Sequence, residues 1–527
     1  MADGRWAARK TGEARRKQNA TRDGLDKGKA KPPCTLINEY TAHSTVHGMR
    51  YITNANLLEK IFWIAALAVC GISACFIANK LWLRYRAVPT ILAVKDIHVP
   101  LYQFPFPSIT VCPAIKVKKS IGLQYLSRYV SEKNDTVRSM LEDIMSALAM
   151  MQQPTYFRIN PHVKASRQLF HHFKHLNVTD FMLTTLPKCE EIFGLCKWHG
   201  QNMNCCESFS LQRTEEGFCY SFNSLTSEAG KHCPLSEVLE NEGIVEEDDI
   251  MYPGCQLRRN TAVGTVTGLE VFLRKANESE SLGLGQRDVD GAKVMVHASY
   301  QFPNAGDGLP VRALPGRRLS IMTLPVITVS SNSVKRLSVD VRGCVFPDER
   351  LLYIYHVYTQ SSCLIQCRMQ LILSLCGCHM YFFTTPNDGN PECGIPHLTC
   401  IMKSTRHIRV LSPPKGTAGF EPHLLETSLN CSHCLPTCYE TSHQLEFESF
   451  PDQNPIAWKY HGYLDVAYGN LGATKYQRDV TFVWTDLLVS LGGVANLFLG
   501  FSILSVVEFV YWAVKISVNT VFRYYNE

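Results

Sequence analysis

Polar and small residues interrupt an otherwise apolar segment near the C-terminus. Residues 487–514 carry Gly492-Gly493, Asn496 and Gly500-Phe501-Ser502, and Glu508 is their one acidic or basic side chain. Glycine permits a helix to break and expose carbonyl oxygens, which can replace part of a cation's hydration shell along a water-filled path. Asn496 and Glu508 agree with such a path, because polar groups in a membrane span usually face a cavity or a partner. The alternative is a close packing seam between helices, and the residue types alone leave both open.

Cysteines and glycosylation motifs fill the long segment before it. Three of the 21 cysteines, Cys34, Cys70 and Cys75, lie before or within an apolar stretch at 61–83, which leaves an even number, 18, in residues 84–484. Such numbers are typical of disulfides formed in an oxidising compartment. The same segment contains three Asn-x-Ser/Thr sites for N-glycosylation, at Asn134, Asn177 and Asn277. We therefore expect an extracellular domain held together by disulfides, with its densest group at 344–438.

Other chemistry is less well supported. Cys431-Ser-His-Cys434 has the spacing of a zinc-ligand pair, but a zinc site needs a second pair, and thiolates do not persist in an oxidising compartment. The acidic run Glu246–Asp249 and the histidines of 170–175 are interpreted as solvated surface. The sequence has no P-loop, nucleophile elbow, metalloprotease helix motif or dinucleotide-binding fingerprint. We expect no enzyme activity, no cofactor other than a permeant ion, no metal and no nucleic acid.

Two elements must position these residues. The stretches 61–83 and 485–514 are each long enough, and poor enough in charge, to cross a bilayer as a helix. A buried helix of a soluble protein is rarely so long and uncharged, and a signal peptide would not begin 60 residues into the chain. The predicted order is a cytoplasmic N-terminus (1–60), a first transmembrane helix (61–83), an extracellular domain (84–484), a second transmembrane helix (485–514) and a cytoplasmic tail (515–527).

Basic residues set the predicted orientation. Residues 1–60 contain 12 Lys and Arg, including Arg15-Arg16-Lys17, and such an excess favours the cytoplasmic side. The chain is thus expected in the plasma membrane with two spans and both termini in the cytoplasm. The basic N-terminus can serve as a solvated tail or bind anionic lipid.

The segment between the spans has mixed secondary-structure signals. Alternating apolar residues predict strands at 335–341, with Leu337, Val339 and Val341 on one face, and at 269–273, 294–297 and 464–468. Helical spacing occurs at 136–151 and 361–373. The prediction is an α+β domain with a sheet core and peripheral helices.

Four signatures resemble the degenerin/epithelial sodium channel/acid-sensing channel family. Ser44-Thr-Val-His47-Gly48 resembles its His-Gly gating motif, and Phe106-Pro-Ser-Ile-Thr-Val-Cys112 its strand after the first span. The cysteine block ending Cys431-Ser-His-Cys434-Leu-Pro-Thr-Cys438 resembles its thumb. Trp484 to Gly493 followed by Leu499-Gly-Phe-Ser502 resembles its pore helix and filter. The tract 472–479 and the Arg342-Gly-Cys344 element are most similar to the insect pickpocket branch.

This resemblance implies a trimer, homomeric or heteromeric with related subunits, whose hand-shaped extracellular domains stand over a sodium-selective, amiloride-sensitive pore in membrane lipid. Gly500, Phe501 and Ser502 would form the selectivity filter for sodium ions, where the second helix breaks and swaps between subunits. Val489 falls at the degenerin gating site, where a small residue is usual. His47 and Gly48 would lie in a re-entrant segment that lines the lower pore, and Asn496 and Glu508 are further pore-lining candidates.

The resemblance also implies a set of disulfides. Its pairs are Cys112–Cys219, Cys344–Cys438, Cys363–Cys434, Cys367–Cys431, Cys376–Cys400 and Cys378–Cys393. Proximity in the sequence suggests pairing the remaining six as Cys196–Cys205, Cys189–Cys206 and Cys233–Cys255.

The sequence departs from the family pattern in places that bear on function. Arg342 stands where acid-sensing members have a tryptophan that meets a wrist tyrosine, here Tyr85, and Asn496 replaces a usual glycine. The C-terminal tail has no Pro-Pro-x-Tyr motif, which favours a sensory or neuronal role. We expect a channel subunit gated by an unidentified extracellular ligand or by force. The alternative is a non-conducting accessory or receptor-like subunit; an ATP-gated channel is disfavoured by the cysteine spacing.

Overall fold

The computed structural model describes most of the chain between residues 33 and 526. The described ranges are 33–54, 56–130, 134–153, 156–230, 233, 255–283, 291–304, 309–312, 316–353, 357–383, 389–413, 417–421, 423, 428–453, 455–460 and 462–526. The basic cluster Arg15-Arg16-Lys17 and the acidic run Glu246–Asp249 lie outside them. The chain forms two compact units, Met1–Ile91 with Val480–Glu527, and Leu92–Asp479.

The first unit is helical and contains both apolar stretches. Helix α4 (Leu57–Ala87) includes the predicted span 61–83 and is long and apolar enough to cross a membrane. Helices α2 (Pro33–His43) and α3 (Met49–Asn54) precede it. Its outward apolar side chains, such as Phe62 and Ile72, are largely exposed in the single chain, as expected for a surface that meets lipid or another subunit.

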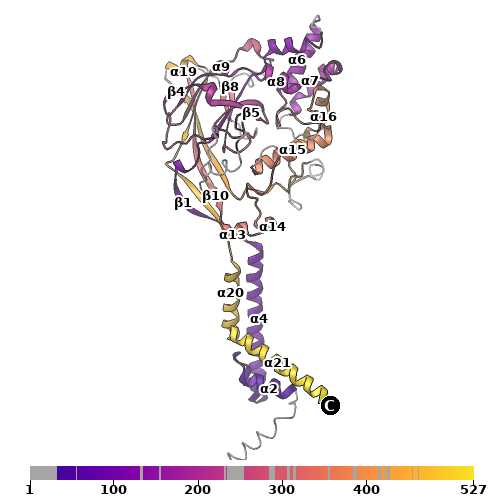
Figure 1. The fold of residues 1–527 in the computed structure, drawn as a ribbon, viewed down its shortest axis with the longest axis vertical. Helices are drawn as coiled ribbons and strands as arrows, with labels where there is room; N and C mark the ends of the chain where they lie inside the picture. The colour runs from indigo at the N-terminus through magenta and orange to yellow at the C-terminus, as the bar shows by residue number, and fades with distance from the viewer. Residues whose placement is uncertain are drawn as a thin grey trace, which may run out of the picture. The chain divides into compact units, whose positions relative to one another are not determined.

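The second apolar stretch is not one helix. Helix α20 (Trp484–Leu499) ends at Gly500, and helix α21 (Ile503–Asn526) begins after Ser502. Figure 1 shows α20 running beside α4, with α21 leaving at an angle. Helix α21 continues well beyond the predicted span end at residue 514, because the tail sequence contains no helix-breaking residue before its end.

The second unit is built on two sheets within its described residues. The larger has the strand order β1 (Thr90–Pro100), β13 (Gly472–Val480), β10 (Arg317–Ser330), β12 (Gly462–Tyr468), β7 (Leu269–Leu273), β3 (Phe193–Trp198), β4 (Gln201–Met203), with β11 (Glu440–Pro451) also paired to β10. The smaller has the order β5 (Phe209–Thr214), β6 (Gly217–Phe222), β2 (Ser108–Pro113), β8 (Gly291–His297), β9 (Leu309–Arg312). The strands predicted at 269–273, 294–297 and 464–468 are therefore confirmed.

The strand predicted at 335–341 is wrong. Two short helical turns, α13 (Asn332–Lys335) and α14 (Val339–Arg342), cover parts of this segment, and α14 ends at Gly343 with φ 66°. Val341 is half exposed, so the alternating residues do not bury one face. The Arg342 side chain instead donates hydrogen bonds to the carbonyl oxygens of Lys335 and Leu337, at 3.2 and 3.1 Å. In a strand, these carbonyls would accept from the N–H groups of a neighbouring strand.

Helices surround the sheets, as expected. Figure 1 shows α6 (Asp135–Ala149), α7 (Asn160–Ser166) and α8 (Val178–Thr185) gathered at one corner, with α15 (Gln360–Cys376) and α16 (Leu398–Lys403) on the same side. Helix α6 buries Leu141, Ile144, Met145 and Leu148, the spacing of one helical face. One hydrophobic cluster joins these residues to Ile365, Met369 and Ile372 of α15, so the predicted helices at 136–151 and 361–373 are confirmed and share a core. The remaining short helices are α5 (Lys119–Leu126), α9 (Cys189–Ile192), α10 (Cys205–Ser208), α17 (Thr405–Arg409) and α19 (Pro455–Lys459).

Nine disulfides cross-link the described residues of this unit. They are Cys112–Cys219, Cys189–Cys206, Cys196–Cys205, Cys233–Cys255, Cys344–Cys438, Cys363–Cys434, Cys367–Cys431, Cys376–Cys400 and Cys378–Cys393. These are the same pairs that the resemblance and the sequence proximity suggested. Cys363, His433 and Cys434 lie close enough to suggest a metal site, but the two cysteines are bonded to each other and offer no thiolate.

Candidate functional site

The break between α20 and α21 is defined by the backbone conformation and hydrogen bonds at Gly500. Gly500 closes α20 with φ 60°, in the left-handed region that favours glycine. Its N–H donates to the carbonyl of Asn496 at 2.8 Å, and the Phe501 N–H reaches that of Ala495 at 3.4 Å. A Cβ added to Gly500 would overlap the imidazole of His47. Glycine is therefore needed here both for its conformation and for its lack of a side chain.

The segment 44–48 lies against this break. The His47 N–H donates to the carbonyl of Leu499 at 3.0 Å, one of the last carbonyls of α20, which have no partner within their own helix. Gly48, with φ 88°, is buried, and a Cβ there would touch Leu67 and Trp63 of α4. The predicted gating residues His47 and Gly48 thus lie between the broken helix and α4.

Polar side chains hold the same segment to α21. The Thr45 N–H and hydroxyl both donate to Oε2 of Glu508, at 3.2 and 2.6 Å. Thr45 also contacts the Ser505 hydroxyl at 2.9 Å, and that hydroxyl is 3.3 Å from the Ser502 hydroxyl. Ser505 is only 2% exposed. Glu508 and Ser502, two predicted site residues, are thus brought together through Thr45 and Ser505.

Sequence reasoning assigned no role to Thr45 or Ser505. Thr45 lies inside the quoted His-Gly motif. Ser505 is three residues from both Ser502 and Glu508, the spacing at which side chains of a helix are neighbours. That spacing was the available signal. The contact between Thr45 and Glu508 could not be predicted from the sequence, because 463 residues separate them.

The other predicted pore residues lie on exposed surface of α20 in the single chain. Val489 is 73% exposed, and Asn496 is also exposed. A Cβ at Gly492 or Gly493 would meet no other atom within 4 Å among the described residues. These glycines therefore form no packing seam within the described part of the chain. The face is left for water, lipid or another subunit.

The three predicted glycosylation sites are accessible. Asn134, Asn177 and Asn277 are all exposed. The side-chain oxygens of Asn177 and Asn277 accept from the N–H groups of Asp180 and Ser279, at 2.9 and 3.2 Å, and so cap short helices. Attachment of a sugar to the side-chain nitrogen leaves these oxygens in place.

Arg342 stands where acid-sensing members have a tryptophan that meets the wrist tyrosine. Its side chain contacts neighbouring residues of the same stretch of chain. It is 5% exposed, forms an ion pair with Glu349, and donates to the carbonyl of Cys344 at 2.9 Å. Its guanidinium also lies over the Phe346 ring, 5.0 Å from the centroid. Arg342 therefore holds residues 335–349 together next to the Cys344–Cys438 bridge.

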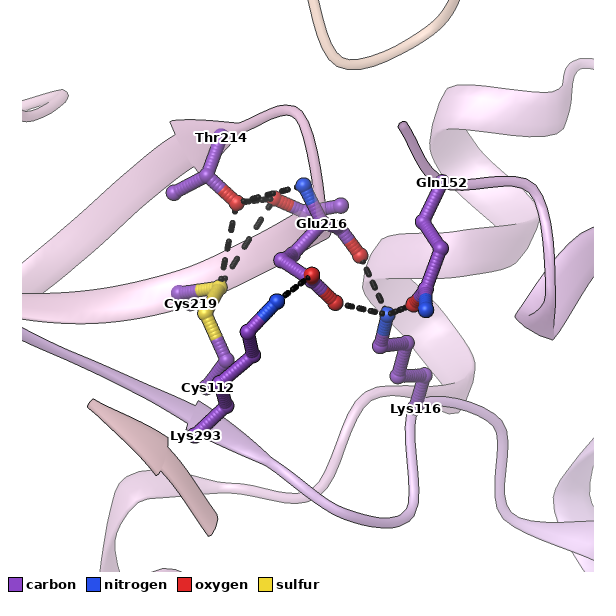
Figure 2. A network of polar contacts seen from close by, with 8 residues as sticks. Cys112, Lys116, Gln152, Thr214, Glu216, Cys219 and Lys293 are labelled. Atoms are coloured by element: carbon purple, nitrogen blue, oxygen red, sulfur yellow. Dashed lines mark hydrogen bonds and ion pairs between the residues drawn. A yellow bond between two sulfur atoms is a disulfide. The ribbon is translucent and has the colours of Figure 1, made fainter. Parts of the chain in front are cut away.

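A buried charge network occupies the β5–β6 hairpin and was not predicted. Figure 2 shows the Glu216 carboxylate between Lys116, at 3.0 Å, and Lys293, beside the Cys112–Cys219 bridge. Burial opposes ionisation of Glu216, but the two lysines outweigh it and hold its pKa below the ordinary value. The adjacent Glu215 forms an ion pair with Arg368 of α15. The pair Glu215-Glu216 before a cysteine was the only signal in the sequence.

Comparisons with known proteins agree with this architecture. The family model of the amiloride-sensitive sodium channel matches residues 40–512. The chain is 24% identical over 488 residues to the sodium channel protein Nach of Drosophila melanogaster, covering 90% of this chain and 86% of that protein. It is 24% identical over 490 residues to pickpocket protein 19 of the same species (90% and 89%), and 22% identical over 519 residues to acid-sensing ion channel 2 of Danio rerio (90% and 84%).

The fold and these matches define a two-span membrane protein of the ion-channel class, with a mixed sheet-and-helix domain rich in disulfides between the spans. The chain belongs to the amiloride-sensitive sodium channel family. The resemblance inferred from its motifs, including the likeness to insect pickpocket proteins, is confirmed. Its membership also makes it a subunit of a cation channel and not an enzyme.

Proposed function

We propose that the chain is a subunit of a trimeric, amiloride-sensitive, sodium-selective channel of the plasma membrane, with Gly500, Phe501 and Ser502 as its filter. The observation that carries this proposal is the break between α20 and α21, held open by His47 and by the Thr45–Glu508 contact. Non-helical backbone at membrane depth is tolerated where it is buried in protein or lines a water-filled cavity. Two spans cannot enclose a pore, so the chain must assemble around a symmetry axis.

The break gives this filter its chemistry. Residues 500–502 belong to neither helix. The Ser502 carbonyl accepts from the N–H groups of Ser505 and Val506, at 3.0 and 3.3 Å, and so begins α21, whereas no backbone N–H of the described residues donates to the carbonyls of Gly500 and Phe501. Such oxygens, repeated by symmetry, can replace water around a permeant sodium ion. The hydroxyl of Ser502 is fixed by Ser505, which limits how far the ring can widen.

The remaining parts of the proposal follow from the family and the chain's charge pattern. Both termini lie in the cytoplasm, since basic residues are frequent before α4. The glycosylated, disulfide-bonded domain faces outside and receives an extracellular chemical or mechanical stimulus. The likeness to insect pickpocket proteins supports a sensory or neuronal role over constitutive salt uptake.

The proposal is tested by replacing Ser502 with alanine and with cysteine in a conducting assembly. We expect the ratio of sodium to potassium permeability, measured from reversal potentials, to fall toward unity, and amiloride-blockable current to change in amplitude. Ser517→Ala is the matched control, because Ser517 also lies on α21 and its hydroxyl bonds to the carbonyl of Ala513 in its own helix. Unchanged selectivity and conductance in both Ser502 variants would exclude the filter assignment.

A non-conducting accessory subunit is the second candidate. The observation that favours it is Asn496, an amide on the exposed face of α20 where a glycine is usual. Surface expression without current, alone and with related subunits, under chemical and mechanical stimulation, would support the accessory role. Any sodium current that requires this chain supports the channel.

A further inference from the structure

A cavity of about 280 Å³ opens in the unit Leu92–Asp479 between elements of both sheets. Its walls come from the end of β2, the start of α5, the short helix α9, the segment after β7 and the start of β8. The volume is close to the lower end of the range for small-molecule sites. None of its lining residues belongs to the charge network of Figure 2, and only Asn277 among them was singled out by sequence reasoning.

The floor of the cavity is apolar. Ile192, Leu273 and Ala292 line it and are buried to at least nine-tenths, and Pro113 and Ile115 complete it. Such a floor favours the hydrocarbon or aromatic part of a ligand, because water leaves it readily.

The carboxylates around the cavity are already occupied. Lys118 donates to both oxygens of Glu191, at 2.8 and 2.9 Å, and lowers the pKa of that carboxyl. Glu280 accepts from the N–H and hydroxyl of Ser120, at 2.9 and 2.7 Å. These contacts tie both sides of the cavity to α5, so its shape is preformed, and they leave little acceptor capacity for a cationic ligand.

Arg274 differs from the cavity's two lysines, Lys118 and Lys275, which form ion pairs with Glu191 and Glu278. The Arg274 N–H donates to the carbonyl of Ile192 at 2.8 Å, and its Nε donates to the carbonyl of Phe193 at 3.1 Å. Among the described residues, no carboxylate lies within ion-pair distance of its guanidinium. The anchored Nε fixes the plane of the group, while its two terminal nitrogens are available to an anion in the fork geometry that suits a carboxylate or sulfonate.

We propose that this cavity binds a small amphipathic organic anion, with its acidic group on Arg274 and its apolar body on the floor. The proposal deepens the proposed function, on which it rests, by naming the chemical class of the extracellular ligand. Bound there, the ligand would contact β7 of the larger sheet and β2 and β8 of the smaller one, and so link the two sheets. The glycosylation site Asn277 lies at the same cavity, where a glycan would limit the size of ligands that enter.

The test uses the full chain in lipid nanodiscs and naphthoate as the probe, with its neutral isostere naphthamide for comparison. Saturation-transfer NMR, with empty nanodiscs subtracted, should show saturable naphthoate binding, with naphthamide at least about tenfold weaker. Arg274→Gln should weaken naphthoate binding by at least about tenfold. Arg317→Gln is the matched control, because Arg317 is also exposed and its guanidinium also bonds to a backbone carbonyl, that of Ser449 at 3.2 Å.

A second variant, Ala276→Trp, fills the cavity without changing charge and should abolish naphthoate binding. Unfolding midpoints establish that each variant is folded. The inference is overturned if folded Arg274→Gln or Ala276→Trp binds naphthoate as the parent does, or if the parent shows no saturable binding. Naphthoate binding in an assembly that never conducts would overturn the channel proposal but support the ligand site. Sodium current in a chain that binds no naphthoate would support the channel proposal and overturn the ligand site.

Discussion

At residue 500 the structure demands glycine for two independent reasons. The φ of 60° disfavours side chains, and the space that a Cβ needs is taken by the imidazole of His47. Two contacts near it fasten the segment 44–48, one to the last turn of α20 and one to α21. The Thr45 N–H and hydroxyl both donate to one carboxyl oxygen of Glu508, and a typical hydrogen bond contributes about 0.5–1.5 kcal/mol to stability. A single substitution at this point therefore disturbs several contacts at once.

We predict that Gly500→Ala abolishes or strongly reduces current while the chain still reaches the cell surface. The added methyl must displace either His47 or the break itself. Current amplitude measured with surface biotinylation separates a conduction defect from a trafficking defect. Gly492→Ala is the control, because its methyl meets no other described atom within 4 Å and alanine is favoured over glycine inside a helix by about 1 kcal/mol. Parent-like current from Gly500→Ala would contradict the assigned geometry.

At the scale of elements, the β5–β6 hairpin connects helix α15 to the smaller sheet. Its tip carries two buried acids, Glu215 and Glu216, whose basic partners come from different parts of the chain. Arg368 reaches Glu215 from α15, while Lys116 and Lys293 reach Glu216 from beside β2 and from β8. The hairpin therefore positions α15 by charge as well as by the shared hydrophobic cluster.

Loss of the Arg368 side chain should be far more damaging than loss of a surface cation. We predict that Arg368→Gln lowers the free energy of unfolding by about 3–5 kcal/mol, because it removes one partner of the ion pair with the buried Glu215 carboxylate. Lys335→Gln breaks the exposed pair with Asp348 and should cost about 0–1 kcal/mol.

Denaturant unfolding of the purified chain, followed by circular dichroism, measures the difference between these variants. The double variant Glu215→Gln/Arg368→Gln should recover part of the lost stability, since no charge remains unpaired. Equal effects of the two single variants would show that the Glu215–Arg368 pair is not a tether.

At the scale of the whole molecule, stability should depend on pH through a histidine between the sheets. His297 of β8 is buried, and its Nδ1–H donates to the carbonyl of Ala298 at 2.9 Å. Its Nε2 accepts from the hydroxyl of Thr110 at 2.8 Å, so the neutral ring has both nitrogens satisfied. Burial lowers its pKa to about 4. The unfolded chain, with an ordinary pKa near 6.5, therefore binds a proton first as the pH falls.

We predict that the free energy of unfolding decreases by up to about 3 kcal/mol as pH falls from about 6.5 to about 4. Glu216, whose pKa lies below the ordinary value, adds a further loss at lower pH, as it too must be protonated. Denaturant midpoints across this range should show the slope, and His297→Gln should make it shallower. His443, whose pKa burial lowers to about 3, should account for part of the slope that remains. His171→Gln, at an exposed histidine, should leave the slope unchanged. An equally steep slope in His297→Gln would assign the pH dependence to other groups.

Local features of this protein were determined by its sequence. The first span, the helices α6 and α15 and the strands β7, β8 and β12 follow from runs and periods of apolar residues, because burial in lipid or in a sheet rewards those patterns directly. The break at residues 500–502 follows from a glycine, whose conformational freedom is a property of the residue itself. The family was likewise readable, because motifs are local.

Tertiary structure decided whatever depends on residues distant in the chain. Leu337, Val339 and Val341 alternate like a strand, yet among the described residues no neighbouring strand pairs with this segment. The Arg342 side chain bonds to the carbonyls of Lys335 and Leu337 instead. The partners Thr45 and Glu508, or Glu215 and Arg368, have no reciprocal signal in a single sequence. The cavity at Arg274 is enclosed by four separate stretches of the chain, 113–118, 187–192, 273–280 and Ala292. Charges and cavities of this kind are set by which surfaces meet, and only the folded chain brings those surfaces together.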